Sequence, residues 1–229
     1  PNPRREAIEK GIQWLDRRFQ ADENPGSGAW FFYYAYSIER VGLAAGIVHL
    51  GGRDWFRELA RASIDRTCRR VDDGRIVLRR DRRTRVDDLA FTLLLLSRGR
   101  VPLLAGKLVL PGASTDERPR DIGRLARIAG DAMESDVGWR RVEVSDPLED
   151  WLSVPVLGLV GRGPLPDRGT PAGAAFHARL GPFLDAGGWL MVVDEGDGRF
   201  GRDVADSIQA VRPRAAIDRA GRDHPIFVW

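Results

Sequence analysis

Residues 155–164, PVLGLVGRGP, decide the fold of the second half of this chain. Residues 156–160 are apolar with little alternation, which is typical of a strand buried on both faces in a parallel sheet covered by helices. A Gly-x-Gly-Pro turn follows the strand at once. Because open α/β sheets bind ligands at the carboxyl ends of their strands, we expect a site at this turn.

The segments on either side of this strand predict further strands and helices in alternation. In chain order they are a connector and strand within 101–110, a helix from 119 to about 135, strands 139–144 and 156–160, a helix from Thr170 closed by Gly187-Gly188, strand 189–193, a short helix near 202–211 and strand 225–229. The residues predicted to face inward are Ile122, Leu125, Ala129 and Met133 in the first helix, and Phe176, Leu180, Phe183 and Leu184 in the second. This order predicts a doubly wound, mainly parallel sheet with helices on both faces.

The first hundred residues predict helices instead, because apolar residues recur there every three or four positions. The predicted helices and their inward residues are 4–20 with Ile8, Ile12, Leu15 and Phe19; about 29–45; one after Gly51-Gly52 with Phe56, Ala60, Ile64 and Cys68; and 86–98 with Val86, Leu89, Leu93 and Leu96. Residues 71–84 are polar and irregular. Segments 34–40 and 89–95 share an order of small, aromatic, hydroxyl and aliphatic residues, which indicates either a repeated helical hairpin or helix packing alone.

The change of pattern near residues 100–107 predicts two domains, residues 1–100 and residues 101–229. The loop at 111–119 is rich in helix and strand breakers, so we expect proteases to cut between Pro111 and Arg120.

Composition limits the partners. Of 36 basic residues two are lysine, which leaves 36 − 2 = 34 arginines, and the net charge is only +3. Arginines alternate with acids, as in residues 140–143, so we expect a solvated surface and no nucleic-acid partner. No run of about 18 apolar residues occurs, so we expect no transmembrane segment. The one cysteine, Cys68, excludes an internal disulfide.

Two stretches, ERVGLAAGIVHLGGRDWF at 39–56 and VDDLAFTLLLLSRGRVPLLAGKL at 86–108, carry a family resemblance. They are similar to the final helices of the α/α toroid of squalene-hopene cyclases and protein prenyltransferases. The chain resembles more closely large bacterial proteins in which such prenyltransferase/squalene-oxidase-type repeats precede an uncharacterised domain. The resemblance implies that residues 1–100 form part of such a toroid.

The second half resembles that uncharacterised domain, whose fold is similar to class I glutamine amidotransferases and is flavodoxin-like. The residues that carry the resemblance are the segments RPRD at 118–121, GGWL at 187–190, Val193-Asp194 and DHPIF at 223–227. It implies an amidotransferase-like α/β domain at 101–229, truncated at its carboxyl end, and a location in the cell envelope.

The catalytic motifs of the resembled enzymes are incomplete. An amidotransferase needs a nucleophilic cysteine on a strand-to-helix turn, and the second half has no cysteine. The cyclase motif Asp-x-Asp-Asp is matched only by residues 85–88, where Arg85 replaces the first acid and the helix dipole accounts for the other two. Cys68 and His49 form no zinc pattern. We therefore expect no catalytic residue, no metal and no cofactor.

A serine triad would have to combine one of the serines with one of the histidines, and no Gly-x-Ser-x-Gly turn supports it. The candidates are Ser145, Ser153 and Ser207, with His177 and His224.

The candidate ligand-binding residues lie at the predicted carboxyl edge of the sheet. They are Gly161, Arg162, Gly163, Asp194, Glu195 and His224. The glycines would let a ligand approach the backbone, Arg162 would hold a carboxylate or phosphate, and Asp194 and Glu195 would take a sugar hydroxyl or a divalent cation. The alternative for residues 161–163 is a tight turn with a surface Arg–carboxylate pair. The alternative for His224 is that Asp223-His224-Pro225 only forms a turn.

These observations predict a non-catalytic binding or scaffolding protein of a bacterial cell, whose partner is a small molecule or a protein. The alternative is an enzyme, either a hydrolase that uses the α/β-domain crevice or a toroid that handles terpenoids.

Overall fold

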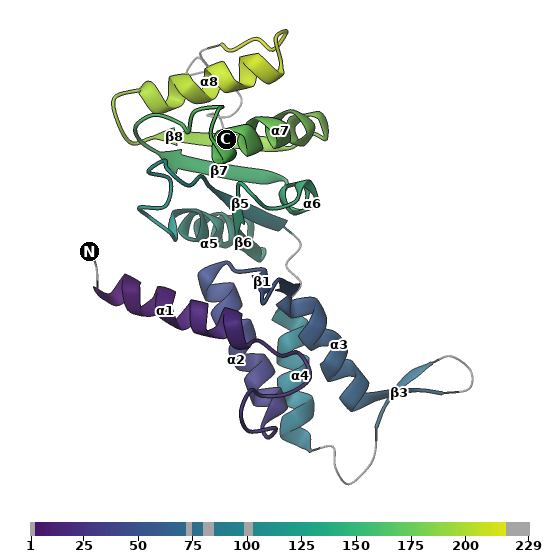
Figure 1. Ribbon diagram of the computed structural model, residues 1–229. Coiled ribbons are helices and arrows are strands. Elements are labelled where there is room, and N and C mark those ends of the chain that lie inside the picture. The colour runs from purple at the N-terminus through teal and green to yellow at the C-terminus, as the bar shows by residue number, and fades with distance from the viewer. Residues whose placement is uncertain (1–2, 72–74, 80–84, 99–102, 219–229) are drawn as a thin grey trace. The chain divides into compact units, whose positions relative to one another are not determined.

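The computed structural model describes residues 3–71, 75–79, 85–98 and 103–218, and within them the chain is mixed α/β (Figure 1). The contacts divide it into two compact units. Unit 1 comprises Pro1–Leu104 and Gly123–Arg141, and unit 2 comprises Ala105–Ile122 and Val142–Trp229. Each unit therefore contains two separate stretches of the chain, whereas the predicted division at residue 100 gives each domain one continuous stretch.

Helices and strands make up most of the described residues. They are α1 (Pro3–Arg18), α2 (Phe31–Ala45), β1 (His49–Leu50), β2 (Arg53–Asp54), α3 (Trp55–Thr67), β3 (Cys68–Arg70), β4 (Ile76–Leu78), α4 (Val86–Arg98), β5 (Leu103–Val109), α5 (Asp121–Met133), β6 (Val137–Glu143), α6 (Leu148–Leu152), β7 (Val156–Gly161), α7 (Pro171–Asp185), β8 (Trp189–Asp194) and α8 (Arg199–Val211). The predicted helices and strands within the described residues are therefore confirmed, whereas α6 and the short β1–β2 and β3–β4 hairpins were not predicted. The predicted strand 225–229 lies outside the described residues.

A core of aromatic and aliphatic side chains holds α2, α3 and α4 of unit 1 together. Its buried members are Phe31, Tyr34, Ala35, Ile38, Leu50, Trp55, Leu59, Ala62 and Leu95. Gly42 of α2 is required there, because a Cβ at this position would lie 2.4 Å from the Trp55 ring. The indole N–H of Trp55 donates to the Ile47 carbonyl at 2.6 Å, so this large side chain is buried with its polar group satisfied.

The predicted inward faces of the unit 1 helices are wrong in several places. Val86 and Leu93 of α4 are 84% and 69% exposed, whereas Thr92 and Leu95 are buried. The buried residues of α3 are Trp55, Leu59, Ala62, Ser63 and Thr67, one position away from the predicted stripe. In α1, Ile8 is 63% exposed. Residues 93–96 are four consecutive leucines, which occupy every side of the helix. Hydrophobic periodicity alone therefore could not define which face of α4 packs against the core.

The main sheet has the strand order β6-β5-β7-β8. β7 runs parallel to both β5 and β8, which confirms the predicted parallel sheet at its centre. β7 is buried from Leu157 onward, as its apolar sequence predicted. Gly158 leaves room in β7 for the side chain of Ile122, since a Cβ there would lie 2.2 Å from Ile122 Cδ1.

The helices beside this sheet show one confirmed and one incorrect face. In α7 the predicted residues Phe176, Leu180 and Phe183 are buried. The helix begins at Thr170, whose hydroxyl accepts the Gly173 N–H at 3.1 Å. In α5 the buried residues are Ile122 and Ala126, while Leu125 and Met133, which were predicted to face inward, are exposed.

Among the described helices, none has the length and apolar character that crossing a bilayer requires.

Candidate ligand-binding site at the carboxyl edge of the sheet

The carboxyl ends of β7 and β8 lie side by side. The two strands pair in register up to Gly161 opposite Asp194, and the Glu195 N–H donates to the Gly161 carbonyl at 2.8 Å. The structure therefore brings Gly161, Arg162, Asp194 and Glu195 to one edge of the sheet, with Gly163 two residues beyond. His224 lies outside the described residues.

Arg162 meets a carboxylate from another loop. Its Nε donates to Glu117 Oε1 at 3.2 Å, and its Nη2 pairs with Glu117 Oε2. Both side chains are exposed, at 55% and 42%. The pair joins the loop after β7 to the loop after β5, and such an exposed pair contributes about 0–1 kcal/mol to stability.

Glu195 forms the second cross-link of this edge. The Arg118 guanidinium lies 2.9 Å from Glu195 Oε1, with Arg118 mostly exposed and Glu195 largely buried. Arg118 and Glu117 are neighbours in the loop after β5, so this single loop is tied to both of the loops that follow β7 and β8. The edge consequently presents alternating positive and negative groups, each already paired.

Asp194 organises the backbone that leads into α8. Its Oδ2 accepts the Gly201 N–H at 2.8 Å, and its Oδ1 accepts the Gly196 N–H at 2.7 Å. These bonds, first that from Gly201 and then that from Gly196, lower the pKa of the Asp194 carboxyl below its ordinary value. Oδ2 thus binds an amide in the first turn of α8 and Oδ1 binds one in the turn before it, so Asp194 holds the backbone at the amino end of that helix.

Gly161 and Gly163 serve the packing and the turn. A Cβ at Gly161 would lie 2.9 Å from the Phe200 ring and 3.1 Å from Thr115 Cγ2, so a buried neighbour occupies the space that a ligand would need. Gly163 has a φ of +77°, a backbone conformation that favours glycine, and a Cβ there would meet open space.

A buried ion pair supports the edge from within. Lys107 of β5 is fully buried, and its Nζ lies 2.7 Å from both carboxylate oxygens of Asp121 and 2.9 Å from the Arg118 carbonyl. All three ammonium protons therefore have acceptors. Lys107 fixes the backbone of the loop that carries Glu117 and Arg118. Lys107 was not among the predicted site residues, although it is one of two lysines in an arginine-rich chain and stands inside an apolar strand.

Three of the serine and histidine candidates, Ser153, Ser207 and His177, contact backbone carbonyls three or four residues before them. Ser153 Oγ donates to the Asp150 carbonyl at 2.8 Å, and Ser207 Oγ to the Asp203 carbonyl at 2.7 Å. His177 Nδ1 lies 2.9 Å from the Gly173 carbonyl. Within the ranges that the structure describes, no three His, Cys, Asp or Glu side chains cluster as metal ligands would.

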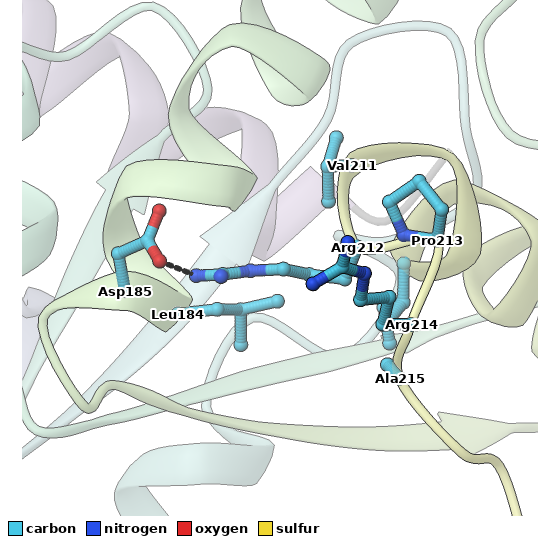
Figure 2. Close-up of a pocket in the computed structure, with 8 residues that line it drawn as sticks. Leu184, Asp185, Val211, Arg212, Pro213, Arg214 and Ala215 are labelled. Atoms are coloured by element: carbon cyan, nitrogen blue, oxygen red, sulfur yellow. Dashed lines mark ion pairs between the residues drawn. The ribbon is translucent and has the colours of Figure 1, made fainter.

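A cavity of about 740 Å³ lies between the carboxyl ends of α7 and α8 (Figure 2). Because both helices run back from the carboxyl edge, this cavity lies at the amino edge of the strands. Arg212 pairs there with Asp185 and donates to the Gly181 carbonyl at 3.2 Å. A cation so placed satisfies the last turn of α7, so this arginine has a structural role at a helix carboxyl end.

A second cavity, of about 460 Å³, lies in unit 1 beside the residues that resemble the cyclase motif. It is lined by Trp30, Phe91 and the two acids of α4, among others. Asp87 pairs with the Arg85 guanidinium at 3.0 Å, and Asp88 accepts the Arg85 N–H at 3.2 Å. Both acids are thus engaged at the amino end of α4.

Arg118 and Arg162 are exposed cations of this edge, and each is paired with a carboxylate, Glu195 and Glu117 respectively. Glu117, Arg118 and Lys107 are the residues that sequence reasoning did not include. No protein-family model matches this chain, and no curated protein is significantly similar to it.

Proposed function

We propose that this chain is a non-catalytic binding or scaffolding protein of a bacterial cell. The observation that carries the proposal is an apolar face on α4 that no described element covers. Val86 is 84% exposed, Leu93 69% and Leu94 37%. We call these three residues the α4 face.

The α4 face has the geometry of a docking surface. Val86 and Leu93 are seven residues apart, two turns of one helix, and therefore lie on the same side. The opposite side of α4, with Thr92 and Leu95, is buried in unit 1, where α4 packs on α2 and α3. Large apolar side chains gathered on an exposed helix face mark interaction sites. Full burial of one such side chain contributes about 1.5–3 kcal/mol.

Helix packing also supports the proposal that residues 1–100 are part of an α/α toroid. The two segments with a shared residue order pack on each other, since the Phe91 ring lies 5.4 Å from the Tyr36 ring and 5.7 Å from the Tyr33 ring. In a stacked helical array, each unit buries its outer apolar face against the next one. The α4 face would be covered in this way.

The proposal for unit 2 is a flavodoxin-like, class I amidotransferase-like fold without amidotransferase activity. In its support, the strands number 2-1-3-4 across the sheet when counted from β5, which begins the flavodoxin-like order 2-1-3-4-5. We place the ligand, a small molecule or a protein, at the carboxyl edge beside Arg118 and Arg162. A location in the cell envelope is part of this proposal and rests on the family resemblance.

Self-association tests the α4 face. Light scattering after size-exclusion chromatography should show that the wild-type chain associates as its concentration rises. The variant Val86→Glu/Leu93→Glu should stay monomeric, because charge on the face opposes its burial. The matched control is Ile8→Glu/Ile128→Glu, since these aliphatic residues are also exposed on helices, at 63% and 60%. A wild-type chain that stays monomeric and binds no hydrophobic dye would contradict the proposal.

A further inference from the structure

One segment of this chain departs from the general alternation of arginines and acids. Residues 68–85, CRRVDDGRIVLRRDRRTR, contain eight arginines and three aspartates, a net charge of 8 − 3 = +5. The whole chain carries +3, so the other residues together carry 3 − 5 = −2. The positive charge of the protein is therefore concentrated in eighteen consecutive residues.

The described part of this segment is the β3–β4 hairpin, which extends from the end of α3 and away from α2 and α4 (Figure 1). Arg69, Arg70, Arg75 and Arg79 are all exposed. No acidic residue occurs among 68–71 and 75–79.

The pairing register gives the hairpin one face with two exposed aliphatic side chains. Cys68 is paired with Leu78 and Arg70 with Ile76, and side chains two residues apart share a face of a strand. Ile76 is 61% exposed and Leu78 55%. The aliphatic side chains thus project beside Arg70 on one face, and Arg69 lies on the other face with Val77.

The base of the hairpin is fixed to the end of α3. The Arg79 N–H donates to the Thr67 carbonyl at 2.8 Å, and Arg79 Nε donates to the Cys68 carbonyl at 2.9 Å. Thr67 is itself buried, and its hydroxyl donates to the Ser63 carbonyl at 2.7 Å. The hairpin therefore presents its exposed face in a defined direction relative to α3.

We propose that the β3–β4 hairpin binds the surface of an anionic lipid bilayer. Arg70, which lies on the same face as Ile76 and Leu78, contacts lipid phosphates, for which the guanidinium geometry is suited. Arg69, on the other face, adds to the attraction through its charge near the bilayer surface. Ile76 and Leu78 enter the boundary between headgroups and acyl chains, as the apolar face of an interfacial element does. Each basic residue near an anionic bilayer strengthens binding roughly fivefold.

The exposed aliphatic residues favour lipid over nucleic acid. Phosphate contacts alone account for non-specific nucleic-acid binding, which gains nothing from the burial of isoleucine and leucine. None of the hairpin residues belongs to the α4 face or to the carboxyl edge of the sheet. The inference therefore stands or falls independently of the proposed function.

Co-sedimentation with lipid vesicles tests the proposal. The wild-type chain should bind vesicles of phosphatidylcholine mixed with phosphatidylglycerol, and bind pure phosphatidylcholine vesicles at least roughly tenfold more weakly. Raising the salt concentration should weaken the binding, because the Debye length falls from about 10 Å at 0.1 M to about 3 Å at 1 M. Equal binding to both kinds of vesicle, or binding to neither, would overturn the proposal without any variant.

Two variants separate the charge from the apolar contribution. Arg69→Gln/Arg70→Gln should lower the affinity for anionic vesicles by roughly 25-fold, at fivefold for each charge. Ile76→Ser/Leu78→Ser should weaken binding at least roughly tenfold with the charge unchanged. The matched control is Arg17→Gln/Arg18→Gln, which removes two consecutive exposed arginines from α1 and should leave binding unchanged.

The chain supplies its own reporter of the contact. Cys68, its one cysteine, is the cross-strand partner of Leu78 and lies on the same face of the hairpin. Anionic vesicles should slow the reaction of its thiol with a water-soluble maleimide, and phosphatidylcholine vesicles should not. An unchanged reaction rate on bound vesicles would mean that another surface binds. Binding to duplex DNA that survives Ile76→Ser/Leu78→Ser, with no vesicle binding, would assign the hairpin to nucleic acid instead.

Discussion

Asp194 ends β8, and its carboxylate accepts the N–H groups of Gly196, in the turn before α8, and of Gly201, in the first turn of α8. Sequence reasoning placed Asp194 and Arg162 at one sheet edge, because parallel strands end on the same side. It could not find their partners. Glu117 lies 45 residues before Arg162, in a loop whose path no local pattern describes. Arg162, Asp194 and Glu195, which the sequence predicts to bind a ligand, are therefore already paired or hydrogen-bonded within the protein.

The Asp194 carboxyl should make stability depend on pH. Its bonds to the Gly201 and Gly196 amides lower its pKa in the folded state. Its contribution is therefore full above the pKa of the unfolded chain and is lost as the pH falls through the lower folded value. Asp194→Asn should be less stable than wild type at neutral pH, and the difference should shrink in acid. Urea unfolding across the pH range measures this. Asp197→Asn, in an exposed pair with Arg199, is the control and should change stability less.

Gly161 offers a test that separates packing from ligand binding. Gly161→Ala should lower the free energy of unfolding by about 1–3 kcal/mol, because the new methyl group overlaps the buried Phe200 ring. Gly169→Ala, in the loop that follows β7, meets only Asp167 Oδ1, at 3.7 Å, and should stay within about 0.5 kcal/mol of wild type. Chemical denaturation compares the two. A Gly161→Ala protein of wild-type stability would restore the view that this glycine leaves space for a ligand.

At the scale of elements, the boundaries of helices and strands could be predicted better than their packed faces. Caps and breakers are local signals, as at Thr170 before α7. Which side of α4 is buried depends on where α2 and α3 lie. A run of four leucines does not indicate one side of the helix as the buried one. The β3–β4 hairpin did leave a signal, since Asp73-Gly74 is a hairpin turn pair that precedes the apolar triplet 76–78.

Lys107 joins β5 to the start of α5 through its ion pair with Asp121. Removing only one of these two charges should lower the free energy of unfolding. Lys107→Met leaves Asp121 without its cation and should destabilise unit 2 by about 3–5 kcal/mol. In the double variant Lys107→Met/Asp121→Asn the loss should be smaller than the sum of the two single losses, because the uncompensated charge is gone. Urea unfolding of all four proteins closes the cycle. Additive losses would show that the two side chains act independently.

At the scale of the whole chain, the alternation of strands and helices was enough to predict a parallel sheet. The strand order β6-β5-β7-β8 could not be predicted in this way, because it depends on which face of the sheet each connection crosses. The exchange of segments between the two units was also beyond the sequence. It arises because α5 and most of β6 have most of their contacts within unit 1, although they follow β5 in the chain.

For the loop after β5, the sequence composition and the structure lead to opposite predictions about proteolysis. Its breakers predicted early cleavage between Pro111 and Arg120. In the structure Thr115 is buried and bonds to both backbone groups of Leu110, so the first half of the loop is closed on itself. The second half is held through Lys107 and the two ion pairs of Glu117 and Arg118. We therefore expect a protease of broad specificity to spare this loop in the wild-type protein.

Loss of the two cross-links should reverse that protection. Arg118→Gln/Arg162→Gln removes both ion pairs and should hasten cleavage between residues 111 and 120, as should high salt, because exposed pairs are screened. Arg168→Gln/Arg199→Gln removes the same charge from exposed arginines elsewhere in unit 2 and should leave the pattern unchanged. Mass spectrometry of the first fragments locates the cut. If the wild-type protein is cut there before any other site, the ion pairs do not hold the loops, and both arginines are free to meet a ligand.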